Sequence, residues 1–175
     1  MPVIENSSFV DDAWSNLHDG DSATDRSMII VPLARLEEVL AGWPADHRGL
    51  GVDVPNDVDV DTLTPHLARL DIVTLNFPGF ADGRAFSQAR SIRHTENFSG
   101  TIRARGSFLP DQYGFLLQSG VDSFEVTDRF ALEEWVRHAE AVPATYQRDY
   151  ATGGLGTRPF GEAGPRQEQP RVRTH

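Results

Sequence analysis

Residues 72–77 read Ile-Val-Thr-Leu-Asn-Phe and form the clearest strand signal in the chain. The run is short, apolar and partly β-branched, which is typical of a buried strand. A loop containing Pro78 and Gly79 follows, and apolar residues then recur at helical spacing from Arg84 onward. A strand, a loop and a helix in this order predict one unit of an α/β fold.

The same alternation extends from this unit in both directions. Further strands are expected at residues 28–31, 50–54, 101–105 and 123–126. Helices are expected to begin near Pro32, Pro65, Arg84, Pro110 and Arg129. Strands that alternate with helices pair in parallel through right-handed crossovers. We therefore expect an α/β fold of about five parallel strands, either an open sheet or a partial (β/α) barrel, and periodicity does not choose between them.

The composition divides the 175 residues into one domain and two unlike ends. Residues 27–150 are expected to form the α/β domain. Residues 1–26 are rich in Asp, Ser and Asn, but Phe9 and Trp14 offer apolar surface, so we expect a partly docked arm. Residues 151–175 are rich in Gly and Pro and poor in apolar side chains. Burial there cannot offset the entropy of ordering, and we expect a flexible tail.

Charge and hydropathy exclude several classes of partner. The net charge is −10, from 26 acidic and 16 basic residues, so nucleic acid is not expected as a partner. No apolar run approaches the roughly 20 residues that span a bilayer. The first residues lack the basic flank and apolar stretch of a signal peptide. We expect a cytoplasmic protein without a membrane partner.

Residue usage also narrows the possible chemistry. The chain has no cysteine, which excludes thiolate nucleophiles and Cys-ligated metal centres. It has no lysine, which excludes the lysine of a Walker-type phosphate loop and any Schiff base. The six histidines show no ligand spacing, and no GxGxxG joins a strand to a helix. We expect neither a metal nor a cofactor.

In α/β proteins, ligand sites collect beyond the carboxyl ends of the strands. For this chain the rule indicates five places: Pro32, residues 53–56, residues 76–84, residues 105–107 and residues 125–128.

A basic cluster coincides with the middle of these places. Residues 82–106 contain five arginines and only two acidic residues, in a chain that is acidic overall. Arg103 and Arg105 are two residues apart on a predicted strand, so both point to one face. Such a cluster suits an anion, while ordinary ion pairing, for example of Arg103 with Glu125, is the alternative. The residues expected to bind an anion are Arg84, Arg103, Arg105 and Gln112.

Two aspartates are candidate proton-transfer groups. Asp82 and Asp111 follow the expected strands closely, although both also suit the capping of a helix. The carboxyl ends of neighbouring parallel strands share one rim. We therefore expect Asp82, Arg84, Arg105, Asp111 and Gln112 to lie near one another.

A longer pattern supports a family resemblance. It comprises Asp82-Gly83-Arg84, Phe86-Ser87, Ala89-Arg90, Gly100, Arg103-Ala104, Gly106, Leu109-Pro110-Asp111-Gln112, Gly120, Asp122, Phe124 and Glu125. In this pattern the chain resembles a bacterial family of unknown function. Its genes lie beside those for sulfite reductase and phosphoadenylylsulfate reductase, and its members are often labelled probable oxidoreductases involved in sulfite reduction. Residues 91–95 depart from the leucine- and arginine-rich pattern of that family.

The resemblance implies a pathway and not a mechanism, so whether the protein is an enzyme stays open. The first expectation is an accessory protein of assimilatory sulfate or sulfite reduction. It would bind sulfite reductase, phosphoadenylylsulfate reductase or an anionic intermediate of the pathway. The second is a small enzyme acting on a phosphorylated or sulfated metabolite at an arginine-lined site. The third is a structural interaction module.

Overall fold

The computed structural model describes residues 1–18, 20–23, 27–79, 82–127 and 129–140. Its strands are β1 (Val3–Glu5), β2 (Ser8–Val10), β3 (Ser15–Asn16), β4 (Ile29–Pro32), β5 (Leu50–Val54), β6 (Ile72–Phe77), β7 (Thr101–Gly106) and β8 (Ser123–Glu125). Its α-helices are α1 (Leu36–Gly42), α2 (Arg84–Arg90), α3 (Tyr113–Gln118) and α4 (Leu132–Glu140). Short helical turns complete it: η1 (Leu33–Arg35), η2 (Val60–Thr62), η3 (Leu67–Arg69), η4 (Ser91–Thr95) and η5 (Pro110–Gln112).

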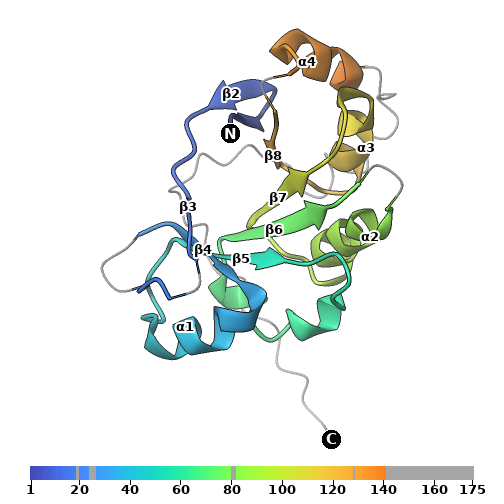
Figure 1. Ribbon diagram of the computed structural model, residues 1–175. Helices are drawn as coiled ribbons and strands as arrows, with labels where there is room; N and C mark the ends of the chain where they lie inside the picture. The colour runs from blue at the N-terminus through green and yellow to red at the C-terminus, as the bar shows by residue number, and fades with distance from the viewer. Residues whose placement is uncertain (19, 24–26, 80–81, 128, 141–175) are drawn as a thin grey trace, which may run out of the picture.

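The strands form one curled, open sheet, a half-barrel, in the order β2-β1-β8-β7-β6-β5-β4-β3 (Figure 1). Within the run from β3 to β8 every pair of adjacent strands is parallel, as the alternation of strands and helices predicts. The expected strands 72–77 and 101–105 are adjacent, as β6 and β7. The α/β class is therefore confirmed for the described residues.

The expectation of about five strands, all parallel, is wrong. The described residues form eight strands, and β1 runs antiparallel to both β2 and β8. The three additional strands come from residues 1–26. Strands β1 and β2 are joined by Asn6 and Ser7, both with positive φ (49° and 58°), as a tight two-residue hairpin requires. Strands of two or three residues are too short to show a period, and no expected helix separates these three. Strand β8 is equally short, but it lies between two expected helices.

The helix expected from Pro65 is also absent from the described residues. The chain makes two separate turns there, η2 and η3, with Pro65 between them. Leu70 is already extended (ψ 142°) and β6 begins at Ile72, so the chain after Pro65 has room for a single turn only.

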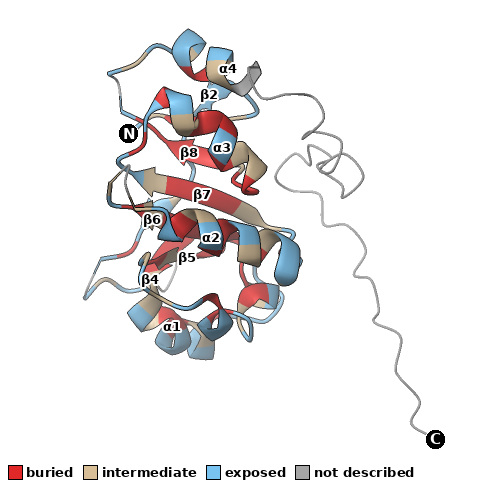
Figure 2. Ribbon diagram, turned by 90° about the vertical axis from the view of Figure 1, so that its right-hand side faces the viewer, coloured by how far each residue is buried: buried red, intermediate tan, exposed pale blue. Residues whose placement is uncertain are grey.

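The helices pack on one face of the sheet. Apolar side chains of alternating strand residues, such as Val52, Leu75 and Ala104, join those of α2 and α3 in a single core. Figure 2 shows the buried, red stretches of the sheet beneath helices whose outer sides are exposed and pale blue. Among the described residues no helix is long and apolar enough to cross a membrane. The tail expected at residues 151–175 lies outside the described residues.

Candidate functional site

The sheet face turned away from the helices is polar. In the parallel register Asp53 lies beside Thr74, which lies beside Arg103, and Asn76 lies beside Arg105. Paired residues on neighbouring strands point to the same side, so these side chains share one surface. We call it the polar face. Its residues are Asp53, Thr74, Asn76, Arg103, Arg105, Ser123 and Glu125.

The first residues of the chain cover this face. Strand β2 ends at one edge of the sheet and β3 begins at the other, so residues 11–14 must cross from edge to edge (Figure 1). Asp12 lies in that crossing and contacts Arg103 on the central strand β7. The expected arm is thus part of the sheet and also a strap over its polar face.

Arg103 is a buried cation, with 2% of its side chain exposed. Its Nη1 donates to both carboxylate oxygens of Asp12 at 3.0 Å, and its Nε donates to Ser123 Oγ at 3.0 Å. The carboxylates of Glu5 and Glu125 each lie 3.7 Å from its guanidinium. Burying a charge is costly unless it is paired and hydrogen-bonded, and these partners meet that demand. We therefore assign Arg103 to the stability of the strap.

Arg105 is closer to the rim and is partly exposed. Its Nε and Nη2 donate to the two oxygens of Glu125 at 2.9 and 2.7 Å, the fork geometry that arginine favours. Nη2 also donates to Asn16 Oδ1 at 2.6 Å. Nη1 forms an ion pair with Asp53 Oδ2 at 3.3 Å. Burial opposes its charged form, but the hydrogen bonds and charges of Glu125 and Asp53 outweigh it and raise the pKa of Arg105.

Asp53 is a partly buried carboxylate of the polar face with a partner on each of its two oxygens. Its Oδ1 accepts a hydrogen bond from Asn76 Nδ2 at 2.9 Å, and its Oδ2 faces Arg105. Burial raises the pKa of Asp53, because the neighbouring Arg105 and Asn76 offset the loss of hydration only in part. Its carboxyl group therefore accepts a proton more readily than an exposed aspartate.

A small pocket of about 220 Å³ opens beside Asp53 and Arg105, at the carboxyl ends of the parallel strands β3, β4, β5 and β7. We call it the strand-end pocket. It is lined by Asn16, Leu17, His18, Ile30, Pro32, Asp53 and Arg105. It combines a cation, a carboxylate, an amide and an imidazole with an apolar floor. That combination suits a small polar ligand.

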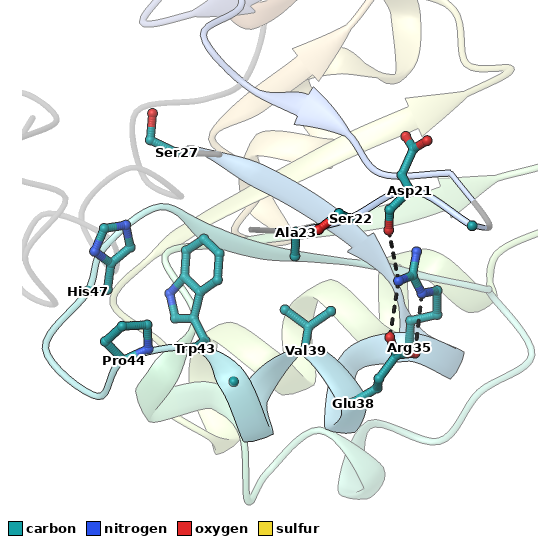
Figure 3. A pocket seen from close by; sticks show the side chains of 12 residues that line it. Asp21, Ser22, Ala23, Ser27, Arg35, Glu38, Val39, Trp43, Pro44 and His47 are labelled. Carbon is teal, nitrogen blue, oxygen red and sulfur yellow. Dashed lines mark hydrogen bonds and ion pairs between the residues drawn. The ribbon is translucent and has the colours of Figure 1, made fainter. Parts of the chain in front are cut away.

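A larger hollow of about 980 Å³ lies between α1 and the segment before β4 (Figure 3). Trp43 and Val39 give it apolar walls, and Arg35 borders it. The Arg35 guanidinium donates to the backbone oxygens of His18 and Asp21 at 2.9 and 3.0 Å, and it also pairs with Glu38. This arginine ties the segment to the helix.

The predicted residues Asp82 and Arg84 lie apart from the polar-face network. They bind each other, with Arg84 Nη2 donating to Asp82 Oδ2 at 2.7 Å, and Asn56 also donates to Asp82. The hydrogen bonds from Arg84 hold the pKa of Asp82 well below its usual range. A carboxyl group that stays ionised is a poor proton donor, so Asp82 is a weak candidate for acid catalysis.

The predicted pair Asp111 and Gln112 opens the helical turn before α3. Gln112 Oε1 accepts from the backbone N–H of Leu109 at 3.1 Å, which caps the turn. Asp111 is exposed to solvent. The structure thus joins Arg103 and Arg105 in one network. It places Arg84 and Gln112 in local contacts of their own.

The remaining arginines of the basic cluster, Arg90 and Arg93, do not line the strand-end pocket. Arg93 donates to the backbone oxygens of Phe98, Gly100 and Gly120 and pairs with Asp122. These partners surround the beginnings of β7 and β8, the opposite end of the sheet. Arg90 is exposed on α2.

Sequence reasoning missed Asp12, Asn16, Asp53 and Glu125 as site residues. The rule that sites lie at strand ends did indicate residues 53–56 and 125–128. A further signal was present in the polar side chains of Asp53 and Asn76, which interrupt otherwise apolar strands. No local signal places Asp12 or Asn16, since their neighbours come from strands about 90 residues away.

A family model matches more than half of the chain. No curated protein and no solved structure matches the chain. A family described as "Bacterial protein of unknown function" matches residues 51–154, which include strands β6 to β8 and all of β5 but its first residue, with Asp53, Arg103, Arg105 and Glu125. Because this stretch is more than half of the chain, the protein belongs to that bacterial family of unknown function (DUF934).

Proposed function

We propose that this protein is an accessory component of assimilatory sulfate or sulfite reduction that binds a small oxyanion in the strand-end pocket. The pathway is inferred from the family resemblance, which implies neighbouring genes for sulfite reductase and phosphoadenylylsulfate reductase. The oxyanion rests on the geometry at Arg105.

One observation supports the oxyanion most directly. Three nitrogens make up the Arg105 guanidinium, and two of them are engaged by Glu125 and Asn16. Among the described residues, Nη1 contacts only Asp53, at 3.3 Å, and both residues line the pocket. A guanidinium nitrogen with donor capacity beside an open pocket is a suitable contact for sulfate, sulfite or phosphate oxygens.

The size of the pocket favours an inorganic oxyanion over a nucleotide. Its 220 Å³ is below the range of roughly 300–1,000 Å³ that holds drug-sized ligands. Adenylylsulfate would have to leave most of its surface outside. We therefore expect sulfite or sulfate to bind more tightly, per atom, than adenylylsulfate.

A thermal-shift titration tests this proposal. A ligand at about 100 times its Kd stabilises a folded protein by about 2.7 kcal/mol. At about 2–4 °C per kcal/mol for a chain of this size, Tm would rise by roughly 5–10 °C. Arg105→Lys keeps the charge but loses the fork, and it should remove the rise. Arg84→Lys is the matched control, because Arg84 pairs with Asp82 away from the pocket, and it should keep the rise.

Two results would contradict the proposal. If sulfate, sulfite and phosphate leave Tm unchanged at low ionic strength, the pocket does not bind oxyanions. If Arg84→Lys abolishes the rise and Arg105→Lys does not, binding occurs elsewhere.

The physiological part of the proposal needs a test in cells. The protein should co-purify with sulfite reductase or phosphoadenylylsulfate reductase from cells grown on sulfate. A deletion strain should grow slowly on sulfate and normally on cysteine. Normal growth on sulfate, with neither reductase enriched, would rule out the accessory role.

A second function, an enzyme acting on a phosphorylated or sulfated metabolite, is favoured by Asp53. Its raised pKa suits proton transfer better than the low pKa of Asp82. Turnover of such a metabolite that is lost in Asp53→Asn, but kept in Asp82→Asn, would favour the enzyme over the accessory protein.

A further inference from the structure

The strand-end pocket places a carboxylate where an oxyanion would have to bind. Asp53 Oδ2 lies 3.3 Å from Arg105 Nη1, the nitrogen that we assign to the ligand. An ionised Asp53 would compete for that nitrogen and repel a bound anion. A protonated Asp53 would instead offer an O–H donor and leave Nη1 available.

Other groups do not relieve this conflict. Glu125 already binds two nitrogens of Arg105 and adds its own negative charge. Asn76 donates to the other oxygen of Asp53 and stays neutral. The arm brings Asp12, whose charge also acts on Arg105. An anion that entered without a proton would therefore meet an excess of carboxylates.

We propose that the strand-end pocket takes up an oxyanion together with one proton, and that Asp53 is the group that holds this proton. The inference rests on the proposed function, since it assumes that an oxyanion binds beside Arg105. In the bound state Asp53 Oδ2–H and Arg105 Nη1–H both donate to oxygens of the anion. The proton comes from solvent, and no other bond forms or breaks.

The surroundings of Asp53 make this proton uptake feasible. Burial already favours the neutral carboxyl group, so an arriving anion needs to shift the protonation equilibrium less far than at an exposed aspartate. The alternative proton acceptor is His18, which also lines the pocket. An imidazole can also take up a proton, so the experiment has to separate the two groups.

The test is isothermal titration calorimetry with sulfate from about pH 5 to about pH 8, a range in which the charge of sulfate does not change. For uptake of one proton, the Kd of the unmodified protein rises about tenfold per pH unit above the pKa of Asp53 in the free protein. Repeating the titration in buffers of different ionisation enthalpy should show about one proton bound per sulfate at the upper end of the range.

Two variants assign the proton. Asp53→Asn has nearly the same shape and donates through its amide without titrating. It should bind sulfate with a Kd that does not change with pH. At about pH 8 its affinity should exceed that of the unmodified protein by about tenfold or more. His18→Gln removes the imidazole and should keep the original pH dependence.

The other outcomes overturn either the proton uptake by Asp53 or the binding of an oxyanion. A Kd for the unmodified protein that is constant with pH overturns the proposal. A pH dependence that survives in Asp53→Asn and disappears in His18→Gln also overturns it, and assigns the proton to His18. If neither the unmodified protein nor Asp53→Asn binds sulfate at any pH, the proposed oxyanion function itself fails. That result is distinct from binding without proton uptake.

Discussion

The strap over the polar face makes a specific prediction about Asp12. This side chain is the closest counter-charge of Arg103, with both of its oxygens 3.0 Å from Nη1. Asp12→Ala would leave Arg103, 2% exposed, with Ser123 and with two carboxylates at 3.7 Å. The variant should be less stable because a buried cation loses its best partner.

The magnitude follows from the contacts that remain. Removing one partner of a fully buried pair costs about 3–5 kcal/mol. Asp12 is 26% exposed, and Arg103 keeps weaker partners, so we expect a loss of about 2 kcal/mol. For a chain of this size the loss corresponds to a fall in Tm of about 4–8 °C.

Urea denaturation and calorimetry would measure this loss. Asp11→Ala is the matched control, because Asp11 is the exposed neighbour and the described residues offer it no ion pair. A double-mutant cycle tests whether Asp12 acts through Arg103. In an Arg103→Met background, Asp12→Ala should lower the free energy of unfolding much less. Hydrogen exchange should increase in residues 11–14 of the Asp12→Ala variant.

Either of two results would show that Asp12 does not stabilise the fold by neutralising Arg103. One is a loss in Asp12→Ala that does not exceed the loss in Asp11→Ala. The other is an equal loss in both backgrounds, which would show that Asp12 does not act through Arg103.

Three further variants test other parts of the structure. Gly106→Ala should cost about 3 kcal/mol in urea denaturation, since Gly106 has φ +120° and an added Cβ would lie 2.2 Å from the backbone oxygen of Phe77. Gly83→Ala, with open space around it, is the control and should change stability little. Asp53 has a raised pKa, so its contribution to stability is complete below its unfolded pKa and is lost as pH rises through its folded pKa. The stability of Asp53→Asn relative to the unmodified protein should therefore increase as pH rises through that folded pKa, and a constant difference in calorimetry would contradict this assignment. Arg84→Ala should leave Tm nearly unchanged, because its pair with Asp82 is exposed, and a fall comparable to that of Asp12→Ala would contradict that reading.

The parallel part of the fold was predictable because it depends on local patterns. The run 72–77 and the strands on either side carry enough consecutive apolar or β-branched residues to show their period. The rule for parallel strands then places their carboxyl ends on one rim, and the strand-end pocket lies there. The same rule indicates residues 53–56 and 125–128, which contain Asp53 and Glu125.

The composition of the site was not predictable in the same way. A charge count placed Arg84 with Arg105 because they are near in sequence and at neighbouring strand ends. In the structure Arg84 turns to Asp82, two residues away, while Arg105 turns to Glu125 and Asp53 on the polar face. The sequence shows which residues are charged. The face of the sheet on which a residue lies and the nearest opposite charge decide which partner it pairs with.

The sequence by itself determined the α/β class, the parallel strands and the end of the sheet at which the strand-end pocket lies, since each depends on periodicity within a few residues or on a general rule of chain topology. Only the tertiary structure decided that the first residues pair at both edges of the sheet and cross its polar face. It also decided that Asp12 neutralises Arg103 and that Asp53 lies against Arg105. The physical reason is that these are pairings between distant segments. Their energies depend on burial and on the distance between charges, and neither quantity is visible in the local order of residues.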